Sequence, residues 1–472
     1  MRRSPVVPLV LVLTSSSVGG CGDSSGVTQG GESGESTRAD SATTAQEPTT
    51  GLTTSGSTSS GATEGAEATS ASSSGDPGSS SATGEATSGE TGETGETAST
   101  GEPMECRPRA DIVAKPLTDP LSEDRLMLFA RPDGYHLFFM IQNPDFETRI
   151  IKLDPEGAVS GPSSSVASPD IWRHTATSGS RYAAATAVAS GQGYKGRVVV
   201  ADVQADDTLA DVGTAIVPSP GWGTGVVALA WNPVAGEWGV LWEDQYNVDP
   251  NMPGYIHARL AFGRVTAEGA WVEGSTRHLT TEDTERSAQL SDWSNPLIWA
   301  GDRYAAVWAE YGPVTTEVFL GELTADGTAT RVLVDEGSFS RGVPAWDGAG
   351  YGVAWGHWDF DDHYNLRFAY VVDGEVGEHV HLGDDQIYSN DASIVATEDG
   401  FTVAWHEMTP GSSRVFYAKV DPLTLAAETT TVTEPEFAGQ DWVQTLVHDG
   451  CRHALAHMHG INPADGWVDL FD

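Results

Sequence analysis

Five acidic or imidazole side chains recur at one place in a repeated phrase. The phrase reads "WGVLWED" (238–244), "RYAAVWAE" (303–310), "YGVAWGH" (351–357), "FTVAWHE" (401–407) and "CRHALAH" (451–457). The residues that end these five copies are Asp244, Glu310, His357, Glu407 and His457. Neutral imidazoles and ionised carboxylates are common ligands of divalent cations. The pattern therefore predicts a binding site at one rim of a repeat protein. It commits to no cofactor, although a divalent cation such as calcium would suit these ligands. The alternative is that strands end here, and strand ends favour polar residues.

Strand geometry separates these polar residues from the apolar ones before them. Side chains alternate between the two faces of a strand. Tyr304, Ala306, Trp308 and Glu310 should therefore share one face. The tryptophan two residues earlier recurs at Trp242, Trp308, Trp355 and Trp405. We expect these rings to pack between neighbouring sheets, with carbohydrate stacking as the alternative.

The spacing between copies of this phrase gives the length of an internal repeat. A turn followed by an aromatic strand occurs seven times, every 47 to 66 residues. These strands start at Tyr135, Tyr182, Trp238, Tyr304, Tyr351, Phe401 and Cys451. Other short runs rich in β-branched and aromatic residues flank each copy, which gives four antiparallel strands per unit. Four-stranded units at this period are typical of β-propeller blades.

The sequence therefore predicts an all-β fold, a seven-bladed β-propeller with four-stranded blades. The last unit supplies three strands, and "ADIVAKPL" (110–117) stands alone before the first. Placed as the outer strand of the last blade, this N-terminal strand would close the ring. The longer spacings place insertions at "EDQYNVDPNMPGY" (243–255) and "TEDTERSAQLSD" (281–292).

The first hundred residues differ from the rest in composition. Arg2 and Arg3 precede the apolar run "PVVPLVLVL" (5–13), which is too short to span a membrane. "TSSSVGGC" then leads to Cys21 and resembles a bacterial lipoprotein signal, which implies lipidation of Cys21. Ordinary secretory cleavage is the alternative. From Cys21 to Met104 the chain is mostly Gly, Ser, Thr, Glu and Ala, which predicts a disordered tether. The predicted domains are a signal peptide (1–20), the tether (21–104) and the propeller (105–472).

Cysteine usage fits an exported protein. The chain has three cysteines, and two remain if Cys21 carries lipid. Disulfides persist in oxidising compartments. We therefore expect Cys106 and Cys451 to form a disulfide that locks the ring, with two reduced cysteines as the alternative.

Charge and missing motifs exclude several function classes. The formal net charge is −42, so phosphate backbones would be repelled and nucleic acid is not an expected partner. The predicted propeller (105–472) contains no G-x-S-x-G, and the chain contains no H-E-x-x-H or P-loop. Its G-x-G-x-x-G run (191–196) opens no predicted helix, so it is not a dinucleotide fingerprint. Many carboxylates could serve a glycoside hydrolase, but spacing alone selects no pair.

The signal peptide, the Ser/Thr/Gly/Glu-rich tether and the repeats together resemble those of the β-propeller lipoproteins of environmental bacteria, a largely uncharacterised family. The resemblance implies a lipid anchor at Cys21 and a monomer in the cell envelope, at the outer membrane or cell surface. The leading functional hypothesis is a non-enzymatic binding module for an extracellular protein or glycan. The alternative is a carboxylate-dependent polysaccharide hydrolase or lyase.

Overall fold

Strands with two apolar faces alternate with short polar turns along the folded part of the chain. The computed structural model describes residues 113–116 and 125–472, apart from 144, 166–171, 191–192, 205, 207, 249–255, 284, 325–327, 338–340, 359–363, 384–387, 410–411, 433–440 and 460–464. These residues form strands and turns, and none of them lies in a helix. Accordingly, the described residues include no helix that is long and apolar enough to cross a membrane. The predicted signal peptide, the tether, Cys21 and Cys106 lie outside them.

The strands form seven antiparallel sheets. The strands of each blade are given from the inner to the outer one. Blade 1 contains β2 (Leu126–Arg131), β3 (Gly134–Asn143), β4 (Asp145–Leu153) and β5 (Ser164–Ser165). Blade 2 contains β6 (Trp172–Thr177), β7 (Arg181–Ser190), β8 (Gly193–Val203) and β9 (Leu209–Ile216), and blade 3 contains β10 (Gly223–Asn232), β11 (Glu237–Asn247), β12 (Ile256–Thr266) and β13 (Arg277–His278).

The next two blades are less regular. Blade 4 contains β14 (Ser287–Gln289), β15 (Leu297–Trp299), β16 (Tyr304–Tyr311), β17 (Thr316–Leu323) and β18 (Ala329–Glu336). Blade 5 contains β19 (Gly342–Trp346), β20 (Tyr351–Trp358), β21 (Tyr364–Val372), β22 (Glu375–Val376) and β23 (Val380–His381).

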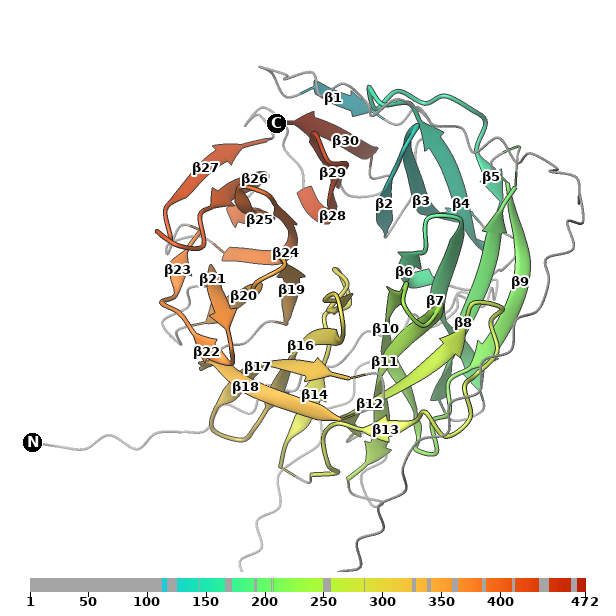
Figure 1. Ribbon diagram of the computed structural model, residues 1–472, viewed down its shortest axis with the longest axis vertical. Helices are drawn as coiled ribbons and strands as arrows, with labels where there is room; N and C mark the ends of the chain where they lie inside the picture. Colours follow the sequence, from blue (N-terminus) through green and yellow to red (C-terminus); the bar gives the residue numbers. More distant parts are fainter. Residues whose placement is uncertain are drawn as a thin grey trace, which may run out of the picture. The chain divides into compact units, whose positions relative to one another are not determined.

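Blade 6 contains β24 (Tyr388–Thr397), β25 (Gly400–Thr409), β26 (Ser412–Val420) and β27 (Ala427–Thr431). Blade 7 contains β28 (Asp441–His448), β29 (His453–His459), β30 (Asp465–Phe471) and β1 (Val113–Pro116). Figure 1 shows the sheets placed around a ring, with β2, β10, β19, β24 and β28 nearest its centre. The predicted seven-bladed propeller is confirmed.

The ring closes as the sequence predicted. Strand β1 pairs with β30 in antiparallel fashion, with Val113 opposite Leu470 and Pro116 opposite Trp467. The closing blade also bonds to the first one, because the Tyr135 hydroxyl donates to Asp449 Oδ2 at 2.6 Å. The N-terminal strand is thus the outer strand of the last blade.

Glycine permits two of the tight turns between first and second strands. Gly134 precedes Tyr135 with φ +134°, and Gly400 precedes Phe401 with φ +128°. A Cβ at these positions would lie 2.1 Å from the Leu153 carbonyl oxygen and 2.5 Å from that of Val420. Only glycine fits both the backbone angle and the close approach.

One apolar cluster fills each of the seven interfaces between described blades. The two faces of β16 divide between two clusters, as strand alternation predicts. Trp308 packs with Phe262 of blade 3, whereas Val307 packs with Trp355 of blade 5. Trp405 likewise packs against blade 5. The rings are therefore packing between blades, as expected.

Blade 4 departs from the regular pattern at its inner strand. This strand is split into β14 and β15, which pair with opposite ends of β16. The seven residues between them, 290–296, leave the sheet, and Figure 1 shows this yellow segment reaching toward the ring centre. The prediction of a simple insertion at 281–292 was wrong, because those residues contain β14 and begin the segment that leaves the sheet.

Candidate functional site

The five rim residues lie near the ends of second strands, and all are buried. Their exposed fractions range from 1% for Asp244 to 8% for His357. The second strand is one place away from the axis in every blade. Side chains on this strand therefore project between blades, and each of the five contacts a residue outside the set.

Asp244, His357 and His457 each form an ion pair or hydrogen bond with an acidic or basic neighbour, as Glu310 also does with two arginines described below. Arg259, opposite Asp244 on β12, donates to Asp244 Oδ2 from Nε at 3.0 Å and from Nη2 at 2.8 Å. The remaining two such contacts involve histidines. His357 Nδ1 donates to Asp335 of the preceding blade at 2.7 Å, and His457 Nε2 donates to Asp469 of its own blade at 2.8 Å.

The two glutamates share a different contact. Trp308 Nε1 donates to Glu310 Oε1 at 3.1 Å, and Trp405 Nε1 donates to Glu407 Oε1 at 3.0 Å. A tryptophan two residues earlier on the same face explains both contacts. The described residues contain no group of three or more His, Cys, Asp or Glu that could hold a metal ion. The rim site thus stays a prediction, and the described geometry gives it no metal centre.

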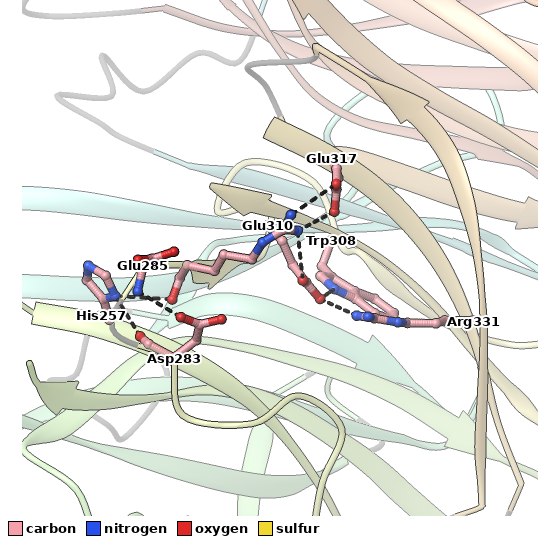
Figure 2. Close-up of polar contacts among 8 residues, drawn as sticks. His257, Asp283, Glu285, Trp308, Glu310, Glu317 and Arg331 are labelled. Atoms are coloured by element: carbon pink, nitrogen blue, oxygen red, sulfur yellow. Dashed lines mark hydrogen bonds and ion pairs between the residues drawn. The ribbon is translucent and has the colours of Figure 1, made fainter. Parts of the chain in front are cut away.

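Glu310 lines an open pocket. The pocket has a volume of about 530 Å³ and lies between blades 3 and 4. Its lining residues are Ala258, Leu279, Thr280, Thr281, Asp283, Arg286, Ala288, Glu310 and Arg331. Figure 2 shows Asp283 on the loop side of this region, with Glu310 and Arg331 on the strand side. We call it the Glu310 pocket.

The loop between β13 and β14 is fixed by side chains of blade 3. His257 Nδ1 donates to the Asp283 carbonyl at 3.0 Å and to the Arg286 carbonyl at 3.1 Å. The Tyr246 hydroxyl accepts from Asp283 N and donates to the Asp283 carbonyl, both at 2.7 Å. The loop is therefore held in place, and it brings Asp283 and Arg286 to the pocket.

Two guanidinium groups surround Glu310. Arg331 Nη1 donates to Glu310 Oε1, and Arg286 Nη1 lies 3.8 Å from Glu310 Oε2. Arg286 also forms a two-bonded ion pair with Glu317, with Nη2 3.2 Å from Oε1. This hydrogen bonding to Glu317 raises the pKa of Arg286, so its positive charge persists. The pocket thus holds Asp283, Glu310 and two arginines in a strongly acidic chain.

A larger depression lies at the opposite ends of the same strands, between blades 4 and 5. Its volume is about 800 Å³. Three carboxylates line it, those of Asp302, Glu322 and Asp373. Glu322 accepts from the Tyr351 hydroxyl at 2.9 Å and lies 3.3 Å from Arg303 Nη1. None of the five predicted rim residues lines it. It therefore offers a weaker basis for a site than the Glu310 pocket.

Asp283, Arg286 and Arg331 were not predicted as site residues from the sequence. Asp283 and Arg286 belong to "TEDTERSAQLSD", which was interpreted as an insertion. The signal that could have found them is the presence of a basic residue among acidic ones in that stretch. Arg331 lies on an outer strand, where an exposed arginine is ordinary.

No family model and no curated protein matches the chain. Solved structures with similar folds include an acylaminoacyl peptidase bound to Z-Gly-Gly-Phe-chloromethyl ketone, with 14% identity, a TM-score of 0.47, and coverage of 74% of this chain and 51% of that one. A Pseudomonas aeruginosa periplasmic gluconolactonase has 12% identity and a TM-score of 0.44, with 71% and 91% coverage. The propeller domain of a Pyrococcus furiosus trilobed protease has 12% identity and a TM-score of 0.43, with 73% and 95% coverage.

These comparisons correct the leading functional hypothesis. The similar propellers belong to enzymes, peptidases and a lactonase, so the hypothesis of a non-enzymatic binding module is withdrawn. The chain spans about half the length of the acylaminoacyl peptidase. At these identities the likeness extends to the fold alone, and none of the named activities is transferred to this chain.

Proposed function

We propose that the chain is a glycan hydrolase whose active site is the Glu310 pocket. The observation that carries this proposal is that Asp283 and Glu310 line one pocket of about 530 Å³. Hydrolysis of a glycosidic bond commonly uses two carboxyl groups that flank the bond. The loop carrying Asp283 and the strand carrying Glu310 are both fixed, so both groups are positioned before substrate binds.

The roles follow from the contacts. Glu310 Oε1 accepts from Trp308 and Arg331, which leaves Oε2 as the oxygen without a donor of its own at hydrogen-bond distance. We assign Glu310 the role of nucleophile or base, acting through Oε2. Asp283 is then the acid that protonates the leaving oxygen. Arg286 and Arg331 would bind a carboxylate or sulfate on the substrate, which favours an acidic glycan.

The test is turnover on a panel of oligosaccharides that includes uronate-containing and sulfated members. Glu310→Gln and Asp283→Asn should each lower kcat/KM by about 10²–10⁴-fold while leaving the protein folded. Glu407→Gln is the matched control, because Glu407 has the same tryptophan contact and does not line the pocket. Absence of turnover by the wild-type protein on every glycan would overturn the proposal.

We further propose that the enzyme is displayed as a monomeric lipoprotein at the outer membrane or cell surface, anchored at Cys21, and that it binds no nucleic acid. The sequence of the signal and tether supports this. A coil of about 80 residues has a root-mean-square reach on the order of 50 Å, enough to hold a propeller away from the membrane. Cys21→Ser should move the protein from the membrane fraction to the soluble fraction, and unchanged fractionation would contradict the anchor.

We also propose the disulfide between Cys106 and Cys451. Pairing of β1 with β30 supports it, because Cys451 lies in the β28–β29 turn of the same blade. In the chain-entropy model such a bond would stabilise the fold by about 4–5 kcal/mol. Mass spectrometry without reductant should find the linked peptide in mature protein, and two free thiols would contradict the proposal.

A further inference from the structure

The depression between blades 4 and 5 has an aromatic and polar lining of its own. Its volume of about 800 Å³ lies within the range of about 300–1,000 Å³ that is usual for ligand sites. Trp346 and Tyr351 line it, with ring centroids 4.6 Å apart and planes at 47°. Among the described lining residues it shares Arg331 alone with the Glu310 pocket, and the guanidinium of Arg331 binds Glu310. We call this depression the Trp346 pocket.

The propeller fold does not require a tryptophan at position 346. By strand register Trp346 lies opposite Tyr351, the first aromatic residue of the second strand. Blades 3 and 4 also have tryptophan at this position. The equivalent residues of blades 1, 2 and 6 are the small Ala130, Thr177 and Ala396, each opposite an aromatic residue of the second strand. Packing alone therefore does not explain the large ring of Trp346.

The N–H edge of Trp346 is accessible from the pocket. The residue is half-buried, and its Nε1 has no hydrogen-bond partner among the described residues, yet it is not one of their buried polar atoms. In contrast, Nε1 of Trp238 and of Trp242 is buried. The turn beside the indole contains Gly301, where a Cβ would lie 3.9 Å from Trp346 Nε1. Because glycine has no side chain, this turn residue leaves the indole edge uncovered.

Fixed hydrogen-bond acceptors and donors lie beside the aromatic rings. Glu322 accepts from the Tyr351 hydroxyl at 2.9 Å and from Arg303 Nη1 at 3.3 Å. Arg303 also donates to both oxygens of Asp302, at 2.7 Å and 3.0 Å. The side chains of Glu322 and Arg303 are nevertheless 35% and 38% exposed, so both can contact a ligand. Asp373, in the turn after β21, adds an exposed carboxylate to the lining.

This mixture of charges selects a class of ligand. An anion would be repelled by the three carboxylates. A cation would compete with Arg303 for Asp302 and Glu322, which already pair with that guanidinium. A sugar hydroxyl both donates and accepts. A neutral sugar can therefore bond to the carboxylates, to Arg303 and to Trp346 Nε1, while its C–H face packs against the indole.

We infer that the Trp346 pocket binds a neutral oligosaccharide, with one sugar ring packed against the Trp346 indole. A volume of about 800 Å³ equals that of about 27 liquid waters at about 30 Å³ each, which leaves room for a short chain of sugar units. This pocket lies between blades 4 and 5, whereas the Glu310 pocket lies between blades 3 and 4. The inference therefore does not rest on the proposed hydrolase site.

The experiment is calorimetric titration of the full mature chain and its Glu310→Gln variant with tetramers of glucose, xylose and mannose. Tetramers of galacturonate and of glucosamine are the charged counterparts. At least one neutral tetramer should bind with one-to-one stoichiometry to both proteins. Trp346→Ala should weaken this binding by about tenfold or more, and Asp373→Asn by about three- to tenfold. Trp231→Ala is the matched control, because Trp231 has the same register position in blade 3, is half-buried and does not line the pocket. It should leave the affinity unchanged.

Three results would overturn the inference. The first is the absence of binding by every neutral tetramer. The second is neutral binding that neither Trp346→Ala nor Asp373→Asn weakens. The third is tighter binding of a charged tetramer at this pocket, recognised because Trp346→Ala weakens it. If Trp346→Ala does not fold, Asp373→Asn carries the test, because asparagine tolerates the φ of +52° at this exposed position. Retained binding by Glu310→Gln distinguishes failure of the proposed hydrolase from failure of this inference.

Discussion

Blades 4 and 6 contain the same phrase and build the same packing unit from it. Trp308 stacks on Phe319 with ring centroids 5.8 Å apart and planes at 27°. Trp405 stacks on Phe416 at 5.7 Å and 18°. In each blade the indole N–H then donates to the glutamate two residues later, Glu310 or Glu407. The phrase therefore encodes packing and a buried carboxylate in both places.

The surroundings of the two units differ. In blade 6 the inner strand β24 is ten residues long, whereas blade 4 has two three-residue strands separated by segment 290–296. The loop before β14 brings Arg286 to Glu310. A repeated motif thus determines where a carboxylate sits, and the neighbouring connection determines whether it lines a pocket.

The largest effect should come from removing the shared ring. Trp308→Ala and Trp405→Ala should each lower the free energy of unfolding by about 3–5 kcal/mol, because each leaves a cavity between blades. Denaturant unfolding monitored by circular dichroism measures this. A much smaller loss for Trp308→Ala would show that the split inner strand lets blade 4 collapse around the cavity, and the packing equivalence would then fail.

The next difference concerns acid. His406 follows Trp405, whereas Ala309 follows Trp308. Burial lowers the pKa of His406 from 6.5 to about 4. The folded state therefore disfavours the protonated ring, so the full stability is present above pH 6.5 and is lost as pH falls toward 4. The loss should reach about 3 kcal/mol at pH 4.

His406→Ala makes blade 6 match blade 4 at this position. The variant should lose less stability between pH 7.5 and pH 4 than the wild type, by about 3 kcal/mol, because the titrating group is gone. Burial also lowers the pKa of His453, to about 3, so some acid sensitivity should remain. Parallel pH profiles for wild type and variant would show that His406 protonates as easily in the folded protein as in the unfolded chain.

A third test concerns the glycine that packs against the Trp308 ring in blade 4. Gly321 of blade 4 corresponds by strand register to Ala418 of blade 6. A Cβ on Gly321 would lie 2.4 Å from the Trp308 ring. Gly321→Ala should therefore cost about 1–3 kcal/mol through overpacking. Ala418→Gly, the reverse change, should cost about 0.5–1 kcal/mol through added chain entropy. Thermal unfolding of both variants measures the asymmetry, and an unchanged Gly321→Ala protein would mean that the Trp308 ring shifts freely.

Much of this comparison could be predicted from sequence, and some could not. The alternation in "RYAAVWAE" correctly placed Trp308 and Val307 on opposite faces, because strand periodicity is local. The ring closure by β1 was predictable from a count of strands. The position of Glu310 at a strand end was equally local. The pocket beside Glu310 could not be predicted, because it depends on the position of the β13–β14 loop, which contacts from blade 3 determine.

Segment 281–296 shows why. Its turn signal, Asn295-Pro296, does not show where the segment runs. Its position is set by contacts from Tyr246, Glu243 and Arg341 on other blades. The outer strands β5 and β13 are only two residues long, so their sequences give no periodic signal. Such features depend on tertiary contacts, which a single sequence does not reveal.

The smallest expected effect on stability separates packing from function at Glu310. Arg331 corresponds by register to Thr429 in blade 6, and its guanidinium lies 4.4 Å from the Phe319 ring centroid. Its side chain is 49% exposed, so Arg331→Thr should cost less than about 1 kcal/mol of stability. If the Glu310 pocket binds acidic glycans, the same variant should raise KM for those substrates by about tenfold and leave KM for neutral glycans unchanged. Equal effects on both substrate classes would mean that Arg331 only holds Glu310, and blades 4 and 6 would then differ in shape but not in charge recognition.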